Sequence, residues 1–260
     1  MNKPNLIDPR TLYKNDEFKD QEQDTPALQD DMLPEPDCGE ESYVGHGRLK
    51  YRNALITGGD SGIGRAAAIA YAREGANVAI QFYPGEERDA NEVKEYIEKE
   101  GVQCLLLPYD LREKNAATKI VEETVEAFGQ LDILVLNAAQ QIAQESLEEL
   151  TMEQVNDTFQ VNIISMFESV KAAEKHLPAG STIITTTSVQ AFDPSPTLFD
   201  YAATKAAIKN FTIGLADYFS GKGIRVNGVA PGPIWTPIQM DDGQPDGAIP
   251  EFGQGSHLGR

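Results

Sequence analysis

Apolar and polar positions alternate along most of this chain in blocks that predict strands and helices in turn. Short apolar runs predict strands at residues 54–56, 77–83, 104–108, 131–136, 181–188 and 224–229, and amphipathic segments predict helices at 65–74, 86–100, 114–128, 151–177 and 199–219. Strands separated by helices predict a parallel sheet covered on both faces. We therefore expect an α/β protein, a doubly wound parallel sheet in three αβα layers.

Residues 1–48 do not follow this alternation. They are acidic, and prolines at positions 4, 9, 26, 34 and 36 interrupt them. Such a composition is typical of a disordered tail. The apolar residues Phe18, Met32 and Tyr43 favour instead an arm that lies across the folded body or a neighbouring subunit. We divide the chain into an N-terminal extension, residues 1–48, and one α/β domain, residues 49–260.

The first strand of that domain ends in a glycine-rich turn from which the first helix begins. Gly58 allows a tight turn, Gly62 allows the backbone to approach a pyrophosphate, and Gly64 allows close packing of helix and strand. The free N–H groups at the helix start then face the phosphates. This arrangement predicts a Rossmann-type nucleotide site, although the spacing Gly-x-x-x-Gly-x-Gly also fits a merely structural turn.

Four polar residues further along the chain are candidates for chemistry. Tyr201 and Lys205 are four residues apart on a predicted helix and share one face. Ser188 ends the fifth strand, where a parallel sheet opens onto its ligand, and Asn162 lies in an apolar stretch of the preceding helix. Each also has a purely structural interpretation, as a surface pair, a strand end or a satisfied buried amide.

Taken together, these residues resemble the short-chain dehydrogenase/reductase family. The matching motifs occur in the family's order over roughly residues 49–240, and they are Thr57-Gly58-x-x-x-Gly62-x-Gly64, Asp110, Asn137-Ala138-Ala139, Asn162, Ser188, Tyr201-x-x-x-Lys205 and Pro231-Gly232-Pro233-Ile234-Trp235-Thr236. The chain is similar in particular to a bacterial subgroup with general-stress and glucose-dehydrogenase-like members. Pro36-Asp37-Cys38-Gly39-Glu40 matches the acidic N-terminal extension of that subgroup.

The resemblance implies an NAD(P)-dependent oxidoreductase that transfers a hydride between nicotinamide and a small carbonyl, alcohol or sugar-like substrate. Tyr201 would be the proton donor or acceptor, and an ammonium at Lys205 would favour its phenolate. Lys205 would also bind the nicotinamide ribose. Ser188 would position the substrate oxygen, and Asn162 would hold a water that relays protons to Lys205.

The same resemblance assigns the remaining site residues. Cofactor binding is expected at Thr57, Gly58, Asp60, Ser61, Gly62, Ile63, Gly64, Gln81, Phe82, Asp110, Leu111, Asn137, Ala138, Ala139, Tyr201, Lys205, Pro231, Gly232, Ile234 and Thr236. Substrate contacts are expected from Ser188, Gln140 and Trp235, with Gln141, Ile142 and Phe192 at the border of the pocket. Ala139 replaces a glycine that is common in the family, and its small side chain should be tolerated. No metal site is expected.

The choice between NAD and NADP depends on the end of the second strand and on the glycine turn. An acid at that strand end usually marks NAD, and basic residues there or in the turn usually mark NADP. Gln81-Phe82-Tyr83 carries no acid, Arg88 is the nearest downstream base, and the turn carries Asp60. Because Asp60 would repel a 2′-phosphate, we favour NAD.

Composition limits the classes of partner that we expect this protein to bind. A formal charge of −19 argues against nucleic acid and anionic membranes. The two cysteines, Cys38 and Cys104, suggest neither a metal site nor a disulfide framework. No signal peptide or membrane span is recognised, so we expect a cytoplasmic protein.

The end of the chain raises doubts about assembly. The family usually continues with a further helix and an edge strand that build a subunit interface, so we expect a C-terminally truncated catalytic domain and leave its assembly into the family's homotetramer in doubt. Two other functions remain open. One is a non-catalytic nucleotide-binding protein that senses redox state or acts through its arm, and the other is a catalytically dead fragment.

Overall fold

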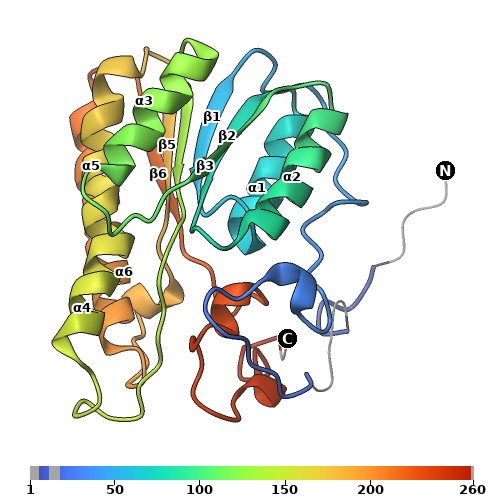
Figure 1. Cartoon of the computed structure of the whole chain (residues 1–260), viewed down its shortest axis with the longest axis vertical. Coiled ribbons are helices and arrows are strands. Elements are labelled where there is room, and N and C mark those ends of the chain that lie inside the picture. Colours follow the sequence, from blue (N-terminus) through green and yellow to red (C-terminus); the bar gives the residue numbers. More distant parts are fainter. Residues whose placement is uncertain (1–5, 12–17, 259–260) are drawn as a thin grey trace.

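A six-stranded parallel sheet forms the centre of the structure, a computed structural model that describes residues 6–11 and 18–258 (Figure 1). Its strands are β1 (Asn53–Thr57), β2 (Asn77–Phe82), β3 (Cys104–Pro108), β4 (Ile133–Leu136), β5 (Thr182–Thr186) and β6 (Arg225–Val229). They lie in the order β3-β2-β1-β4-β5-β6. The order reverses between β1 and β4, and ligands of such sheets bind beside this point at the carboxyl ends of the strands.

Helices cover both faces of the sheet, as the apolar pattern predicts. On one face α1 (Gly62–Arg73) and α2 (Glu87–Lys99) bury Ala68 and Val93 against Ile80 of β2. The other face carries α3 (Ala116–Phe128), α5 (Ser165–Ala173) and α6 (Phe199–Ser220). Strands covered on both faces need apolar residues at nearly every position. The predicted doubly wound α/β fold is confirmed. In the described part of the chain no helix is long and apolar enough to cross a bilayer.

The long helix predicted at 151–177 is divided in the structure. It begins where expected, because the Thr151 hydroxyl caps α4 (Met152–Phe159) by accepting a bond from the N–H of Gln154, at 3.1 Å. One turn of π-helix, η2 (Gln160–Ile164), then separates α4 from α5. Such turns are rare and occur mostly at functional sites. Asn162 lies in this turn.

Residues 18–48 of the N-terminal extension lie against the body, whereas residues 6–11 are exposed. Ala27 and Met32 form a small apolar cluster with Met240 and Ile249, and Phe18 and Trp235 pack against it. Figure 1 shows part of the arm, in blue, beside the last segment, in red, below the sheet. Within residues 1–48, positions 1–5 and 12–17 lie outside the described residues.

β6 is an edge strand of the sheet, since it pairs with β5 alone among the described strands. The chain beyond it, up to residue 258, forms two short 3-10 turns, η5 (Pro237–Gln239) and η6 (Ile249–Glu251). Val229, at the end of β6, is about half exposed. The segment after β6 turns towards the arm and the cavity described next.

Candidate active site

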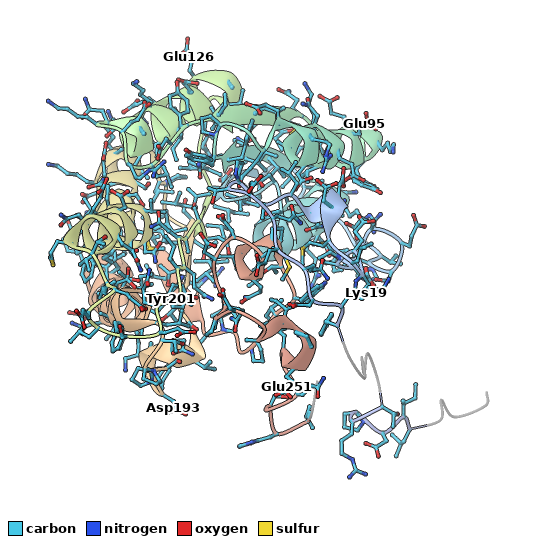
Figure 2. The ribbon with its side chains drawn as sticks, turned by 60° about the horizontal axis from the view of Figure 1, so that its bottom comes forward. Lys19, Glu95, Glu126, Asp193, Tyr201 and Glu251 are labelled. Atoms are coloured by element: carbon cyan, nitrogen blue, oxygen red, sulfur yellow. The ribbon has the colours of Figure 1, made fainter. Side chains whose placement is uncertain are left out.

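A cavity of about 290 Å³ opens at the carboxyl edge of the sheet. Parallel strands bring all their carboxyl ends to one edge, so residues far apart in sequence meet there. The cavity is lined from the segments that follow each of the six strands, by Gly58, Tyr83, Asp110, Asn137, Ser188 and Pro231 among others. Figure 2 shows the side chains with this lower part of the molecule turned forward and with Tyr201 labelled.

The glycine turn at one end of the cavity is tightly packed. Gly58 has a φ of +60°, and a Cβ there would lie 3.0 Å from the Cα of Ala138. A Cβ on Gly64 would lie 1.7 Å from the carbonyl oxygen of Gly58, so a side chain at that position would push helix and strand apart. The Thr57 hydroxyl accepts bonds from the N–H groups of Asn137 and Ala138, at 2.9 and 3.0 Å. The turn is thereby fixed to the loop after β4.

Acidic side chains surround the same end of the cavity. Asp60 is 1% exposed, and its Oδ2 has no hydrogen-bond partner among the described residues. Burial raises the pKa of the Asp60 carboxyl to about 7. Burial and the nearby Asp60 raise the pKa of Glu86 to about 9. Gln81 contributes a neutral side chain, which accepts a bond from the N–H of Gly58 at 3.1 Å and donates one to the carbonyl of Tyr109 at 2.8 Å.

Asn162 joins three parts of the site. Its Oδ1 accepts a bond from the N–H of Gln140 at 2.7 Å, and its Nδ2 donates to the carbonyl of Gln140 at 2.9 Å and to the Thr204 hydroxyl at 3.0 Å. The π-turn therefore ties the loop after β4 to α6. The side chain is fully buried. Both donors of the amide are used inside the chain, and one lone pair of Oδ1 remains.

Ser188, Tyr201 and Lys205 gather at the other end of the cavity. The Lys205 amino group donates to the carbonyl of Thr186 at 3.1 Å and lies 5.1 Å from the centre of the Tyr201 ring. Burial, which disfavours the charged form, lowers the pKa of Lys205 to about 7. Burial raises the pKa of Tyr201 to about 12, although a hydrogen bond with Ser188 opposes the shift. Both side chains are almost fully enclosed.

Most of the residues expected from the sequence line this one cavity. Of the expected cofactor and catalytic residues, the cavity is lined by Gly58, Asp60, Ser61, Gly62, Ile63, Gln81, Asp110, Leu111, Asn137, Ala138, Ala139, Ser188, Tyr201, Lys205, Pro231, Gly232, Ile234 and Thr236. Gln140 and Gln141, expected near the substrate, line it as well.

The other expected residues lie behind the lining or away from it. Thr57, Gly64 and Asn162 hold the turn and the loops in place, and Phe82 belongs to the apolar core under α1 and α2. Trp235 has a different position from the one expected. Its indole N–H donates to the carbonyl of Pro34 at 2.7 Å, and its ring stacks on Phe18 at 4.0 Å, so it packs against the arm. Phe192 is 65% exposed, and Ile142 lines a separate hollow.

Sequence reasoning missed several residues of the lining. Glu86 and Arg112 follow the second and third strand ends, so the strand-end rule could have found both. Arg112 pairs with Asp110 at 2.8 Å and donates to the Tyr83 hydroxyl at 2.9 Å. The arm contributes Thr25, Pro26 and Ala27 to the lining, and no periodicity in the sequence indicates this long-range contact.

The fold and the cavity at its carboxyl edge define a nucleotide-binding α/β protein of the Rossmann type. The chain belongs to the short-chain dehydrogenase family, whose model matches residues 52–246. It is 55% identical over 256 residues to the uncharacterized oxidoreductase YhxD of Bacillus subtilis, covering 98% of this chain and 86% of that protein. It is 47% identical over 235 residues to General stress protein 39 of the same organism, covering 90% and 82%.

A solved structure resembles the fold closely. A short chain dehydrogenase from Burkholderia cenocepacia in complex with NADP matches with a TM-score of 0.69 and 37% identity, over 76% of this chain and 80% of that one. The chain is thus an NAD(P)-dependent oxidoreductase of this family, within the bacterial subgroup expected from its sequence.

Proposed function

We propose that this protein transfers a hydride between a nicotinamide dinucleotide and a small carbonyl, alcohol or sugar-like substrate, with Tyr201 as the proton donor or acceptor. The observation that carries the proposal is that one cavity holds the glycine turn at one end and Ser188, Tyr201 and Lys205 at the other. A dinucleotide needs a cradle for its phosphates and a reactive end beside polar groups. The bound cofactor supplies the hydride chemistry, and the chain supplies orientation and protons.

The proton steps follow from the environment of Tyr201. With the substrate oxygen held by the Ser188 hydroxyl, the Tyr201 hydroxyl gives its proton to a carbonyl or takes one from an alcohol. A buried phenol with its pKa near 12 is a poor base at neutral pH. A protonated Lys205, 5.1 Å from the ring, stabilises the phenolate and lowers that pKa during the reaction. Asn162 acts mainly by position, and its free Oδ1 lone pair accepts a water that leads to Lys205.

The acidic end of the cavity favours NAD. The unpartnered Oδ2 of Asp60 is suited to accept a hydrogen bond from a ribose hydroxyl. This free acceptor makes the cavity suitable for a dinucleotide. A 2′-phosphate placed there would meet Asp60 and Glu86. Arg88, the nearest base downstream of the second strand, is paired with Asp30 and Asp31 of the arm. The solved relative holds NADP, and our preference for NAD in this chain rests on these side chains alone.

A non-catalytic binding protein is the weaker alternative. Binding a dinucleotide requires the glycine turn, but it does not require a serine and a buried tyrosine beside a buried lysine. The geometry at Ser188, Tyr201 and Lys205 therefore supports catalysis over redox sensing alone. We keep the division into an extension (1–48) and a catalytic domain (49–260) as part of the proposal.

The setting of the enzyme is also proposed. We place it in the cytoplasm, acting on small molecules and not on nucleic acid or membranes, as its charge of −19 favours. We propose a homotetramer. Support comes from exposed apolar residues on neighbouring helices, Ile164 (48%) and Phe167 (53%) on η2 and α5 and Ile213 (65%) on α6. Phe167 stacks on Phe211 of α6 at 3.9 Å, which places the two helices side by side.

A panel of aldehydes, ketones, alcohols and sugars, assayed with NAD, NADH, NADP and NADPH by nicotinamide absorbance, tests the proposal. The wild-type chain should turn over part of the panel. Tyr201→Phe should lose at least a hundredfold in kcat while its affinity for the dinucleotide changes less than threefold, since removing a general acid typically costs 10²–10⁴ in rate. Dinucleotide binding without turnover of any substrate, or normal turnover by Tyr201→Phe, would contradict it.

A further inference from the structure

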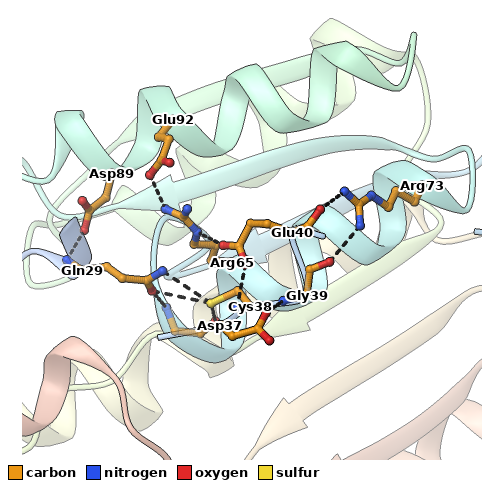
Figure 3. Close-up of polar contacts among 10 residues, drawn as sticks. Gln29, Asp37, Cys38, Gly39, Glu40, Arg65, Arg73, Asp89 and Glu92 are labelled. Atoms are coloured by element: carbon orange, nitrogen blue, oxygen red, sulfur yellow. Dashed lines mark hydrogen bonds and ion pairs between the residues drawn. The ribbon is translucent and has the colours of Figure 1, made fainter. Parts of the chain in front are cut away.

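The N-terminal arm reaches the glycine turn through one buried side chain. Gln29 is fully buried in η1 (Gln29–Asp31), and its Oε1 accepts a bond from the N–H of Gly62 at 2.8 Å. Its own N–H donates to Asp89 Oδ2 at 2.6 Å, which anchors it to α2. Figure 3 shows Gln29 between Asp89 and Cys38. Gln29 does not line the cavity, and the proton steps proposed above do not use it.

Cys38 contacts the other polar group of the same glycine. Its Sγ lies 3.5 Å from the carbonyl oxygen of Gly62 and 3.5 Å from Nε2 of Gln29. The arm therefore contacts Gly62 at both its N–H and its C=O. Gly62 has a φ of +52°, and a Cβ there would lie 2.7 Å from Thr236. Glycine adopts this left-handed conformation without strain, and the close approach of Thr236 leaves no room for a side chain there.

A buried arginine of α1 binds the part of the arm that contains Cys38 and Glu40. Arg65 is 1% exposed and donates to Glu40 at 2.8 Å and to Glu92 of α2 at 2.7 Å. Arg73, two turns further on α1, donates to the carbonyl oxygens of Gly39 and Tyr43 at 2.8 and 2.7 Å. Figure 3 shows both arginines turned towards the stretch around Glu40. The stretch that carries Cys38 thus has a fixed position on the helix that starts in the glycine turn.

The same arm closes part of the cavity. Thr25, Pro26 and Ala27 line its acidic end, and the Thr25 hydroxyl donates to Asp241 in the segment after β6. Residues 25–40 therefore support the turn from behind and border the space in front of it. A dinucleotide in the cavity would meet the arm directly and also through Gly62.

We infer that the arm is part of the dinucleotide site and that Gln29 is the residue that positions its glycine turn. This inference rests on the proposed function. Without the acceptor on Gln29, the N–H of Gly62 is buried without a partner, and the turn must shift to satisfy it. A shifted turn no longer presents its remaining N–H groups to the phosphates in a fixed geometry, and binding weakens because preorganisation is lost. By reciprocity, a bound dinucleotide stabilises the docked arm.

Gln29→Met keeps the length of the side chain and removes its acceptor, so it tests the positioning role. Gln21→Ala is the control, because among the described residues Gln21 bonds to Lys19 and Leu33, both in the arm. Calorimetry with NAD and with NADP should show at least tenfold weaker binding by Gln29→Met than by wild type. In the turnover assay, kcat of this variant at saturating dinucleotide should stay within twofold of wild type. Gln21→Ala should bind within twofold of wild type. Equal affinity in Gln29→Met, or an equal loss in both variants, would overturn the inference.

Hydrogen exchange on the wild-type chain tests the coupling without any mutation. Saturating NAD should slow exchange at least fivefold in peptides that cover residues 27–40. Exchange there that does not change with bound NAD would overturn the coupling. If the wild type binds neither dinucleotide, the proposed function itself fails. If the wild type binds and Gln29→Met binds equally well, only the inference about Gln29 fails.

Discussion

Lys205 holds an amino group inside the protein with one backbone carbonyl as its partner. Its depressed pKa has a consequence for stability. The unfolded chain keeps the Lys205 proton up to about pH 10.5, whereas the folded chain releases it near pH 7. Between these values unfolding takes up a proton, so this residue makes the fold less stable at pH 7 than at pH 10.

Lys205→Met should therefore be more stable than wild type at neutral pH. The expected gain is roughly 2–4 kcal/mol at pH 7 and below, and it should shrink towards zero as the pH approaches 10, because the penalty for the buried charge disappears there. Denaturant melts of both proteins between pH 6 and 10 measure it. Lys209→Met, one turn further along α6, is the control. A stability difference that does not vary with pH would contradict the assignment.

Asp60 should decide between the two dinucleotides. Asp60→Asn removes the charge at the acidic end of the cavity and keeps the shape of the side chain, so NADP should gain about tenfold in affinity relative to NAD, or ~1.4 kcal/mol. Because the pKa of Asp60 is near 7, wild-type discrimination against NADP should be weaker at pH 6 than at pH 8. Calorimetry at both pH values tests this, with the exposed Asp193→Asn as control. Tighter binding of NADP by the wild type would reverse our preference.

The residues found from the sequence share a local signal. Gly58, Gly62, Tyr201 and Lys205 are recognisable because a turn or a helical spacing fixes their relation within a few positions. The contacts of Gln29 and Trp235 have no such signal, since their partners lie 33 and 201 residues away, at Gly62 and Pro34. Contacts of that kind depend on how the arm folds back, which alternation of apolar and polar positions does not encode.

At the scale of elements, the positions of strands and helices could be predicted to within a few residues. The π-helical turn that divides the helix predicted at 151–177 could not. The helix start predicted at residue 151 agrees with the structure, where the Thr151 hydroxyl accepts a bond from the N–H of Gln154. The π-turn at Asn162 leaves no mark in the pattern, because one extra residue in a turn changes the apolar spacing very little. It is nevertheless the feature that turns the Asn162 amide towards Gln140.

Two segments, the arm and the stretch after β6, should loosen together if their contact is removed. Trp235→Ala deletes the stack on Phe18 and the bond to Pro34, at a cost of about 1–3 kcal/mol, since the ring is only partly buried. Hydrogen exchange should then rise both in residues 18–34 and in residues 231–252, and remain unchanged in α3. Phe192→Ala is the control, because that ring lies outside the cavity. A rise in only one of the two segments would show that they are independent.

At the scale of the whole molecule, the exposed apolar side of α5 and α6 should form a subunit interface. Phe167→Asp combined with Ile213→Asp places charges there and should reduce the oligomer to smaller species, since a buried unpaired charge disfavours association. Sedimentation velocity measures this, with Tyr51→Asp as a control at another exposed aromatic residue. A wild type that is monomeric at micromolar concentration, or a double variant with unchanged mass, would contradict the proposed homotetramer.

The buried position of Arg65 has a practical consequence for anyone who trims this protein. The family match begins at residue 52, and a fragment cut at that point would keep every motif of the family. It would also leave Arg65 with Glu92 as its one ion-pair partner among the residues that the structure describes, because Glu40 would be gone. The cut also removes the arm that packs over Arg65, so the loss is that of a charge-assisted hydrogen bond, about 1.5–3 kcal/mol, which is still a sizeable share of the stability of an ordinary domain. The shortest fragment that folds well should therefore start upstream of Glu40, outside the limits of the family model.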